Sequence, residues 1–500
     1  MFNAAADGAG ESTTEVQPEL LTGRIARRAV ERPDATAIVA RDDRIGLAAF
    51  WARVTRTAAG LAGMNRVAVL PTSDIGSVVA VVAAMHAGVS IVLLHRHLTP
   101  DQLTRMLELT APGAVVAEPN QHRRLRRMGF RGDVYAADAL EARGPIGDPR
   151  PGGGSGASPR RARGQAPSAQ PGGELLVGIT SGTSGEPKLF VRNQKSWAAT
   201  LDRSDATLSA IGGGDRVAVP GVLDHTHFLY GALHALTRGA TVDLRSAEIS
   251  LNDGATHLYS VPTLAWDVVR SVPGPIESVR EVLSSAARWP RAGRHALQAI
   301  LPNASLVHFY GASELSFVSF DRGLGSARED SAGHLFAGVE AQIRDGLVFV
   351  RSDMLFDGYL TAAGVMGGPV DGWMSVGDRG RLCGSELQLL GRAGEMLIRA
   401  GLNVDLAAVD AALAAIPGIA EAACAAVPDA RMGEVPAAAI VADPGAPSIA
   451  EIRRQLRRTL PSPSMPVRIL TVERLPRTPR GKLDRAALVA MLGGVPDSAG

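Results

Sequence analysis

Residues 66–94 read RVAVLPTSDIGSVVAVVAAMHAGVSIVLL, and the pattern of this stretch changes twice. Arg66–Leu70 is a short β-branched run that is typical of a buried strand, and Ile75–Ala87 has the composition of a buried helix. Gly88 follows that helix directly, where a left-handed C-cap favours glycine. Residues 89–94 are strand-like again. The stretch therefore predicts a strand–helix–strand unit whose two strands run parallel in one sheet.

The same order of patterns recurs later in the chain. A β-branched run at 216–220 is followed by a helix-like stretch at 226–237, a glycine and a strand-like run at 240–244. A third, weaker copy begins at 256–260 and continues into a helix after Pro262, and proline is well placed in a first helical turn. Repeated units of this kind predict an α/β fold, with a large N-terminal domain of mostly parallel sheets wrapped by helices.

The composition is that of a globular chain with more than one domain. Its 500 residues exceed one ordinary domain, and 46% of them are hydrophobic and 20% charged. A net charge of +2 gives no reason to expect a nucleic acid as partner. The 4% of aromatic residues also argues against a stacking platform for single strands.

The cysteines and the most apolar window favour a cytoplasmic protein. Cys383 and Cys424 stand far apart, so they form neither a disulfide framework nor a zinc-ligand spacing. The first residues are acidic and polar, unlike a signal peptide. Residues 75–94 have the length of a membrane span, but their pattern changes across Gly88. We therefore expect a buried helix, turn and strand there, and no transmembrane segment.

A break in composition near Gly391 divides the chain into two expected domains. The larger one spans 19–390. The smaller one spans 391–492 and contains a helix-like stretch at 406–415 and a strand-like stretch at 437–441. We expect it to be an α+β unit of ordinary domain size.

Three segments lack apolar periodicity and are expected to be disordered. Residues 150–173 are rich in Gly, Pro and Ser and contain the cluster RRAR. They offer neither an ordered scaffold nor aromatic residues, so a disordered surface loop is a better interpretation than a nucleic-acid-binding patch. The other two segments are the N-terminus, 1–18, and the tail, 493–500.

The stretch TSGTSGEPK, residues 180–188, follows a strand-like run at 175–179. Glycines let the backbone approach a ligand closely, and hydroxyl and amide groups donate to phosphate oxygens. Lys188 adds a compact positive charge, and it is one of only three lysines in the chain. These features predict a polyphosphate-binding loop, although the spacing is not that of a P-loop. A flexible surface turn is the alternative.

Two further blocks place a carboxylate on a loop. HFYGASE, residues 308–314, puts Glu314 at a loop tip, where it could hold a phosphate-bridging metal or be a solvated turn residue. WMSVGD, residues 373–378, puts Asp378 after a glycine. There it could accept hydrogen bonds from two ribose hydroxyls or cap the loop.

Five blocks in this order resemble the acyl-adenylate-forming (AMP-binding) superfamily, and acyl-CoA synthetases in particular. They are TSGTSGEPK, YGASE, VGD, GR with GLNV behind it, and PRTPRGKLDR, and the resemblance covers residues 20–488. It implies that a carboxylic acid attacks the α-phosphate of ATP, which releases pyrophosphate and gives an acyl-adenylate. The thiol of CoA then displaces AMP. ATP, Mg²⁺ and CoA are the implied cofactors.

The same resemblance assigns roles to individual residues. Glu314 would hold Mg²⁺, and Lys482 would bridge the substrate carboxylate and the α-phosphate, so these two are the implied catalytic residues. Residues 180–188 would bind the β- and γ-phosphates, Tyr310 would lie against the adenine, and Asp378 would bind the ribose. The implied nucleotide-binding residues are Thr180, Ser181, Gly182, Thr183, Ser184, Gly185, Lys188, Ser285, Ala286, Ala287, Tyr310, Gly311, Ser313, Asp378 and Arg392.

The resemblance also implies that the small domain is mobile and carries Lys482 into and out of the site between the two half-reactions. Gly394 stands at the expected hinge, where the family usually has a charged residue, and glycine can absorb a backbone rotation. Ser285 stands where glycine is usual. These departures bear on thioester formation more than on adenylation.

The acyl pocket is expected to be apolar, which favours a fatty or other apolar acyl substrate. Relatives that activate amino acids hold the amine with an aspartate, but here the spacing puts Thr226 at that place and Asp224 only near it. His225 and His227 could form a metal pair, with capping or pocket lining as the simpler interpretation. The expected lining residues are His225, His227, Phe228, Tyr259, Phe309 and Phe317.

Two other functions stay open on the sequence alone. The phosphopantetheine of an acyl or peptidyl carrier protein could replace CoA as the acceptor. The chain could also be a degenerate nucleotide-binding regulator, which Gly394 and Ser285 suggest. Carboxylate-dependent pyrophosphate exchange separates this regulator from the enzymes, and the thiol acceptor separates the two enzymes from each other.

Overall fold

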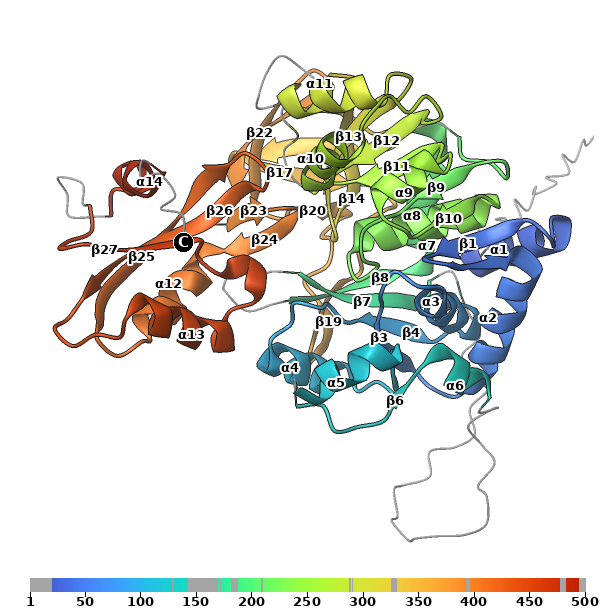
Figure 1. Ribbon diagram of the computed structural model, residues 1–500, viewed down its shortest axis with the longest axis horizontal. Helices are drawn as coiled ribbons and strands as arrows, with labels where there is room; N and C mark the ends of the chain where they lie inside the picture. The colour runs from blue at the N-terminus through green and yellow to red at the C-terminus, as the bar shows by residue number, and fades with distance from the viewer. Residues whose placement is uncertain are drawn as a thin grey trace, which may run out of the picture.

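The computed structural model describes residues 20–127, 129–142, 170, 172–180, 188–207, 210–286, 289, 291–324, 331–392, 396–476 and 483–493. Its strands form two large sheets in the N-terminal part of the chain and a smaller third sheet in the C-terminal part (Figure 1). This mixed α/β architecture confirms the predicted fold class. The expected disorder of 1–18, of nearly all of 150–173 and of nearly all of 493–500 concerns residues outside those described.

The largest sheet in the described part of the chain has a parallel centre and antiparallel flanks. In spatial order its strands are β16 (Glu340–Arg344), β17 (Leu347–Arg351), β21 (Asp378–Cys383), β22 (Glu386–Arg392), β15 (Ser331–Leu335), β14 (Ser316–Arg322), β13 (Ser305–Ala312), β12 (Glu281–Ser284), β11 (His257–Ser260), β9 (Arg216–Ala218), β10 (Thr241–Asp243), β1 (Thr36–Ala40) and β2 (Asp43–Gly46), with β20 (Trp373–Met374) beside β17. The run from β13 to β1 is parallel. The strands from β14 to β16 add an antiparallel extension that the strand–helix–strand pattern did not predict.

The second large sheet repeats this plan. Its strands are β19 (Gly364–Met366), β18 (Gly358–Thr361), β8 (Lys188–Asn193), β7 (Glu174–Thr180), β4 (Ser90–Leu93), β3 (Arg66–Leu70), β5 (Val115–Ala117) and β6 (Val134–Tyr135). The strands from β7 to β6 are parallel, whereas β8, β18 and β19 pair antiparallel. The pairing of β8 with β18 brings residues near 190 beside residues near 360.

Helices fill the space between the two large sheets and cover their outer faces (Figure 1). The inner helices are α1 (Leu21–Glu31), α2 (Leu47–Leu61), α3 (Ile75–Ala87), α6 (Ala137–Glu141), α7 (Gln194–Thr207) and α8 (Thr226–Arg238), and the outer ones are α4 (Pro100–Thr110), α5 (Pro119–Arg127), α9 (Ala247–Asn252), α10 (Pro262–Ser271) and α11 (Arg291–Ile300). Residues 77–85 of α3 are all buried. The helix is apolar all round because it packs between two sheets.

All three predicted strand–helix–strand units are present, and the weaker third one consists of β11, α10 and β12, whose strands pair in parallel. In the first, β3, α3 and β4 follow one another, and Gly88 ends the helix with a φ of 68°. In the second, β9, α8 and β10 follow one another, and Gly239 ends the helix with a φ of 74°. A left-handed residue at this place satisfies helix carbonyls that would otherwise lack a donor, and glycine adopts it without steric cost.

The small domain is an α+β unit with its own core. Its sheet contains β24 (Leu402–Asp405), β23 (Met396–Arg399), β26 (Gly433–Ala442), β25 (Ile419–Asp429) and β27 (Arg468–Thr471), and its helices are α12 (Leu406–Ala414), α13 (Ile449–Thr459) and α14 (Arg485–Gly493), with a 3₁₀ turn at Ser462–Ser464. The large sheet ends with β22 at Arg392, and the small sheet begins with β23 at Met396. The change of sheet therefore falls between Arg392 and Met396.

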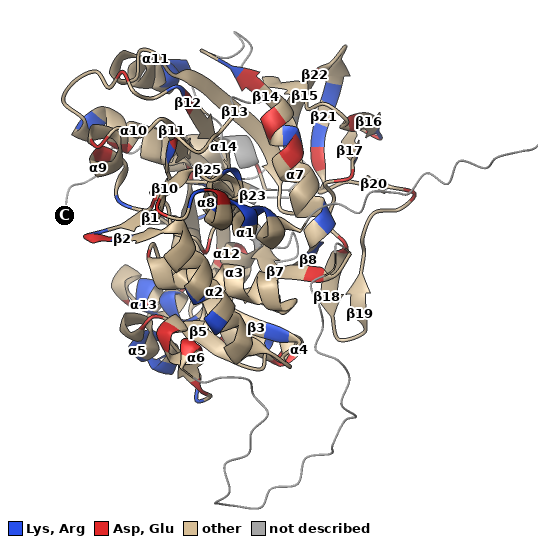
Figure 2. Cartoon of the chain, turned by 90° about the vertical axis from the view of Figure 1, so that its right-hand side faces the viewer, with Lys and Arg blue, Asp and Glu red and all other residues tan. Residues whose placement is uncertain are grey.

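No helix among the described residues is both long and apolar enough to span a bilayer. The apolar window that raised this question is divided between α3, which has 13 residues, and β4. A spanning helix needs about 20 residues. Figure 2 shows positive and negative residues interspersed over much of the described chain.

Candidate active site

Lys188, Tyr359 and Glu314 form a chain of contacts at one end of the β8–β18 pair. Lys188 opens β8, and its Nζ lies 4.9 Å from the centroid of the Tyr359 ring. The Tyr359 hydroxyl donates to Glu314 Oε1 over 3.1 Å. The structure thus brings together the end of the predicted phosphate loop and the predicted metal ligand. Tyr359 was not singled out from the sequence, where its only signal is that it closes GLVFVRSDMLFDGY, a stretch that resembles the family.

A tight hairpin between β13 and β14 positions Glu314. A Cβ on Gly311 would lie 2.0 Å from the carbonyl oxygen of Ser316, so only glycine fits at this bulge. The Glu314 carbonyl accepts a hydrogen bond of 2.9 Å from the Phe356 amide. Glu314 is only 6% exposed. The carboxylate is therefore held inside the molecule, which contradicts the interpretation of a solvated turn residue.

Arg192 is a second residue that sequence reasoning missed at this place. It is 4% exposed, its Nη1 donates to the Ser313 carbonyl over 3.1 Å, and its Nε donates to Ser196 Oγ over 3.1 Å. Its Nη2 has no hydrogen-bond partner among the described residues. Burial lowers the pKa of Arg192 to about 10, while the charges of Asp357 and Glu314 oppose that shift. A buried guanidinium with an unused N–H group is suited to an anion.

Tyr310 and Asp378 meet although 68 positions separate them. The Tyr310 hydroxyl donates to Asp378 Oδ2. Tyr310 lies in β13, and Asp378 opens β21 directly after Gly377, whose φ is 85°. The β21–β22 register places Asp378 opposite Arg392 in the backbone. The residues implied for the adenine and for the ribose are therefore neighbours.

Ser285 and Ala286 follow β12, at the place where the small domain reaches the large one. Ser285 is buried, and its hydroxyl donates to the Phe309 carbonyl over 3.0 Å. Ala286 has a φ of 74°, which is strained for a residue with a side chain. Gly401 of the small domain has a φ of 82°, and a Cβ on it would lie 2.8 Å from Ala286 Cβ. Glycine is required at 401 both for its conformation and for this close approach.

An ion pair adds a second contact between the domains. Arg431 Nη2 lies 2.8 Å from both carboxylate oxygens of Asp267, which belongs to α10 of the large domain. Both side chains are partly exposed, so the pair contributes only about 0–1 kcal/mol. It orients the small domain more than it stabilises the protein.

Ring contacts connect all six residues expected to line the acyl pocket. The ring centroid of His227 lies 5.2 Å from that of Phe228, 5.3 Å from that of Tyr259 and 5.4 Å from that of Phe309. The remaining links are Phe309–Phe317 at 4.3 Å and His225–Phe228 at 6.0 Å.

The two histidines of this pocket differ in their surroundings. His227 is buried among aromatic rings, whereas His225 is affected by the charges of Asp224 and Arg96. His227 Nε2 lies 2.9 Å from the Ser260 carbonyl, which can only accept, so this nitrogen carries a proton. Burial lowers the pKa of His227 to about 3 and also lowers that of His225. The described residues contain no group of three or more His, Cys, Asp or Glu that could hold a metal ion.

Several sequence-based assignments fall on residues that the structure does not describe. Thr180 ends β7 and pairs with Lys188, but Ser181, Gly182, Thr183, Ser184 and Gly185 lie outside the described residues. Ala287, the hinge residue Gly394 and Lys482 also lie outside them. Their roles stay predictions.

The protein has two lobes, a large α/β domain and a small domain. A lysine, a buried glutamate and a Tyr–Asp pair lie together in the large domain. This is the architecture of an enzyme that activates substrates with a nucleotide. The family model described as AMP-binding enzyme matches residues 25–360, and that of the AMP-binding enzyme C-terminal domain matches residues 408–482. The chain belongs to the AMP-binding enzyme family, and it is an AMP-forming acid–thiol ligase of the acyl-CoA synthetase type.

Two similar proteins are related to this chain in sequence, and a third shares its fold. An uncharacterised acyl-CoA ligase of Bacillus subtilis, YhfT, is 33% identical over 340 residues, which are 64% of this chain and 69% of the relative. A malonyl-CoA ligase bound to methylmalonyl-CoA and AMP is 27% identical, with a TM-score of 0.72 over 89% of this chain and 97% of that chain.

The protein that shares the fold has been solved with more than one ligand. The o-succinylbenzoate CoA synthetase of Bacillus subtilis, bound to a product analogue, has a TM-score of 0.78 and is 22% identical over 93% of this chain and 98% of that chain. The same enzyme in complex with ATP and magnesium has a TM-score of 0.65 at equal identity and coverage.

Proposed function

We propose that this protein activates an apolar carboxylic acid with ATP, through an acyl-adenylate, and transfers the acyl group to CoA. The observation that carries the proposal is the convergence of Lys188, Tyr359 and Glu314 with the Tyr310–Asp378 pair around one hairpin. This arrangement puts a cation and a buried carboxylate on one side of the hairpin and a ring with a hydrogen-bond acceptor on the other. A polyphosphate joined to a nucleoside needs both sets of groups.

The donor set fits a magnesium ion that arrives with the nucleotide. Among the described residues Glu314 stands without the further carboxylates or histidines that an all-protein cage would need. Mg²⁺ is commonly held by one or two carboxylates together with substrate phosphates. When bound, it would neutralise charge on the phosphate oxygens. The Tyr359 hydroxyl would orient the Glu314 carboxylate toward it.

In the first half-reaction, residues of this chain position the nucleotide and stabilise negative charge. Lys188 would bind the β- and γ-phosphate oxygens, and Arg192 offers an unused N–H group near Glu314. Asp378 would accept hydrogen bonds from the ribose. Lys482 would approach the substrate carboxylate and the α-phosphate, where charge builds up on the attacking and bridging oxygens. Attack of the carboxylate forms the acyl-adenylate and breaks the bond to pyrophosphate.

The second half-reaction would use the arrangement of domains in this structure. Gly401 packs against Ala286 at the rim of the site. The higher TM-score to the synthetase bound to a CoA product analogue, 0.78 against 0.65 for its ATP complex, supports an arrangement suited to thioester formation. Attack of the CoA thiolate on the acyl carbon then forms the thioester and releases AMP.

Asp224, which directly precedes the pocket residue His225, does not favour an amino acid as substrate. Asp224 Oδ2 accepts a hydrogen bond of 2.9 Å from the Arg96 amide, and Arg96 Nη1 lies 3.6 Å from Asp224 Oδ1. Burial raises the pKa of Asp224, which weakens it as a partner for an ammonium group. Three of the six pocket rings are phenylalanines, Phe228, Phe309 and Phe317, so we assign an apolar acid, aliphatic or aryl.

Pyrophosphate release over a panel of carboxylic acids tests this function. We expect release to depend on acid and Mg·ATP, and a thioester to form when CoA is added. If a thioester formed only with a carrier-protein phosphopantetheine, that group rather than CoA would be the acceptor. Absence of release with aliphatic, aryl and amino acids alike would contradict the proposal.

A further inference from the structure

Four aromatic rings next to the Tyr310–Glu314 segment form a continuous series of contacts. We name Tyr230, Tyr259, Phe309 and Phe317 the floor rings. Phe309 and Phe317 lie 4.3 Å apart, Phe317 and Tyr230 5.2 Å, and Tyr230 and Tyr259 6.1 Å, measured between ring centroids. All four side chains are at most 6% exposed.

These spacings leave no passage for an acyl chain between the floor rings. Apolar heavy atoms in contact lie about 4 Å apart, so a methylene chain passing between two rings would separate their faces by roughly 8 Å. The observed distances of 4.3–6.1 Å are those of rings packed directly on one another. As these rings are packed, an acyl chain cannot pass between them.

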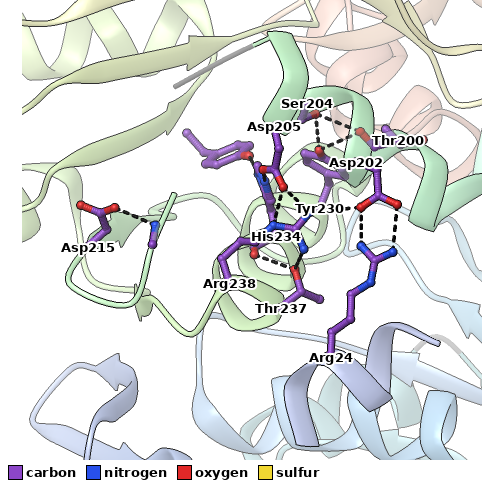
Figure 3. Close-up of polar contacts among 12 residues, drawn as sticks. Arg24, Thr200, Asp202, Ser204, Asp205, Asp215, Tyr230, His234, Thr237 and Arg238 are labelled. Carbon is purple, nitrogen blue, oxygen red and sulfur yellow. Dashed lines mark hydrogen bonds and ion pairs between the residues drawn. The ribbon is translucent and has the colours of Figure 1, made fainter. Parts of the chain in front are cut away.

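A buried polar network holds the two tyrosines of the floor in place, and Figure 3 shows the part of it around Tyr230 and His234. His234 Nε2 lies 2.7 Å from Asp205 Oδ1, and because a carboxylate accepts, this nitrogen donates. His234 Nδ1 shares a hydrogen bond with the Tyr259 hydroxyl, 2.8 Å away. Tyr230 shares a hydrogen bond with the hydroxyl of Ser204.

The network continues outward and is anchored on another helix (Figure 3). Arg238 of α8 bridges Asp205 and Asp202 of α7, and Asp202 accepts from Arg24 Nη2 of α1 over 2.9 Å. Moving either tyrosine ring would therefore break buried hydrogen bonds as well as ring contacts.

A glycine in the middle of α8 lets the Tyr259 ring lie directly on the helix backbone. A Cβ on Gly231 would lie 2.7 Å from Tyr259 Cγ. Glycine weakens a helix interior, so its presence here is explained by the close approach of the ring. The α8 backbone also stops Tyr259 from moving away from the pocket on that side.

From these contacts we infer that the floor rings limit the substrate to a small carboxylic acid, such as a short aliphatic or a monocyclic aryl acid, and exclude long fatty chains. The inference rests on the proposed function, and it narrows the apolar substrate expected from the sequence. The rings determine specificity by occupying the space into which a longer chain would extend.

Binding of acyl-adenylate analogues tests this inference without turnover. The probes are N-acylsulfamoyl adenosines with a butanoyl and a dodecanoyl chain, and sulfamoyl adenosine without an acyl group, titrated calorimetrically against the full chain. We expect the butanoyl probe to bind at least about tenfold more tightly than the dodecanoyl probe. Equal or tighter binding of the dodecanoyl probe, with sulfamoyl adenosine bound, would overturn the inference and leave the proposed function standing. Failure of all three probes to bind would overturn the proposed function and the inference with it.

Substitution of Phe317 tests which side chain sets the limit. Phe317→Ala is expected to raise the affinity for the dodecanoyl probe at least about tenfold, because it removes a ring from the floor. Phe317→Leu is a smaller truncation that serves if the alanine variant does not fold. Phe50→Ala is the matched control, since it removes a fully buried phenyl ring from α2, a helix that carries none of the floor rings. An unchanged preference in both Phe317 variants, or an equal change in Phe50→Ala, would contradict the assignment.

Discussion

At the scale of single residues, Lys188 is the cation that we propose binds the phosphates of ATP. Lys188→Ala should raise the KM for Mg·ATP about tenfold with a smaller effect on kcat, because it removes a charge-assisted contact to the bound nucleotide. Steady-state pyrophosphate release at varied Mg·ATP measures this. Lys195→Ala is the matched control, since Lys195 is exposed on α7. An unchanged KM in Lys188→Ala would show that this residue does not bind the phosphates.

Tyr359 connects the lysine to the glutamate, and its hydroxyl can be removed while the ring stays. Tyr359→Phe should raise the Mg²⁺ concentration needed for half-maximal activity several-fold, because Glu314 loses the donor that orients it. The cation–π contact with Lys188 remains, so the KM for ATP at saturating Mg²⁺ should change little. A Mg²⁺ titration measures the effect, and an identical titration curve for the variant would argue against this orienting role.

At the scale of elements, neutral buried histidines make stability depend on pH. Burial lowers the pKa of His95 and of His227 to about 3, against 6.5 in an unfolded chain. Between these values the unfolded state binds protons that the folded state does not, so stability falls as pH falls below about 6.5. Each group should cost about 2 kcal/mol at pH 5 relative to pH 7, at about 1.4 kcal/mol per pKa unit.

Urea unfolding at pH 5 and pH 7 measures this loss. His227→Gln should reduce the difference between the two pH values, because a neutral amide replaces the titrating ring. His334→Gln, at an exposed position in β15, should leave it unchanged. Equal stability of the unmodified protein at both pH values would show that the histidines do not act in this way.

How much could be predicted from sequence differs between elements. The β3–α3–β4 and β9–α8–β10 units could be predicted, because a local pattern and a C-capping glycine define each of them. The antiparallel strands from β14 to β16 could not, because their short mixed patterns acquire meaning only from distant partners.

The same distinction applies to the site. Glu314 and Asp378 lie in recognisable blocks, whereas Tyr359 gains its place from the pairing of β8 with β18, which are about 170 positions apart. The six residues proposed for the pocket could be predicted to lie together. Their packing into a closed floor could not, because it depends on the α8 backbone at Gly231 and on the network behind Tyr259.

At the scale of the whole molecule, the contact of Gly401 with Ala286 predicts a selective effect on one half-reaction. Gly401→Ala adds a Cβ 2.8 Å from Ala286 Cβ. It should slow thioester formation from supplied acyl-adenylate at least about tenfold while acid-dependent pyrophosphate exchange is largely kept, since only one domain arrangement is blocked. Gly445→Ala is the matched control, because Gly445 has a similar φ of 88° and nothing within 4 Å of an added Cβ. Equal effects of the two variants would attribute the loss to backbone strain alone.

We propose that the two domains share one ATP-dependent reaction, to which the large domain contributes Lys188 and the small domain Lys482. The most direct measurement is a comparison of both half-reactions in the unmodified protein and in Lys482→Ala. Lys482→Ala is expected to abolish acyl-adenylate formation from acid and ATP but largely to keep thioester formation from supplied acyl-adenylate and CoA. Equal loss of both half-reactions, or an unchanged rate of adenylation, would contradict it.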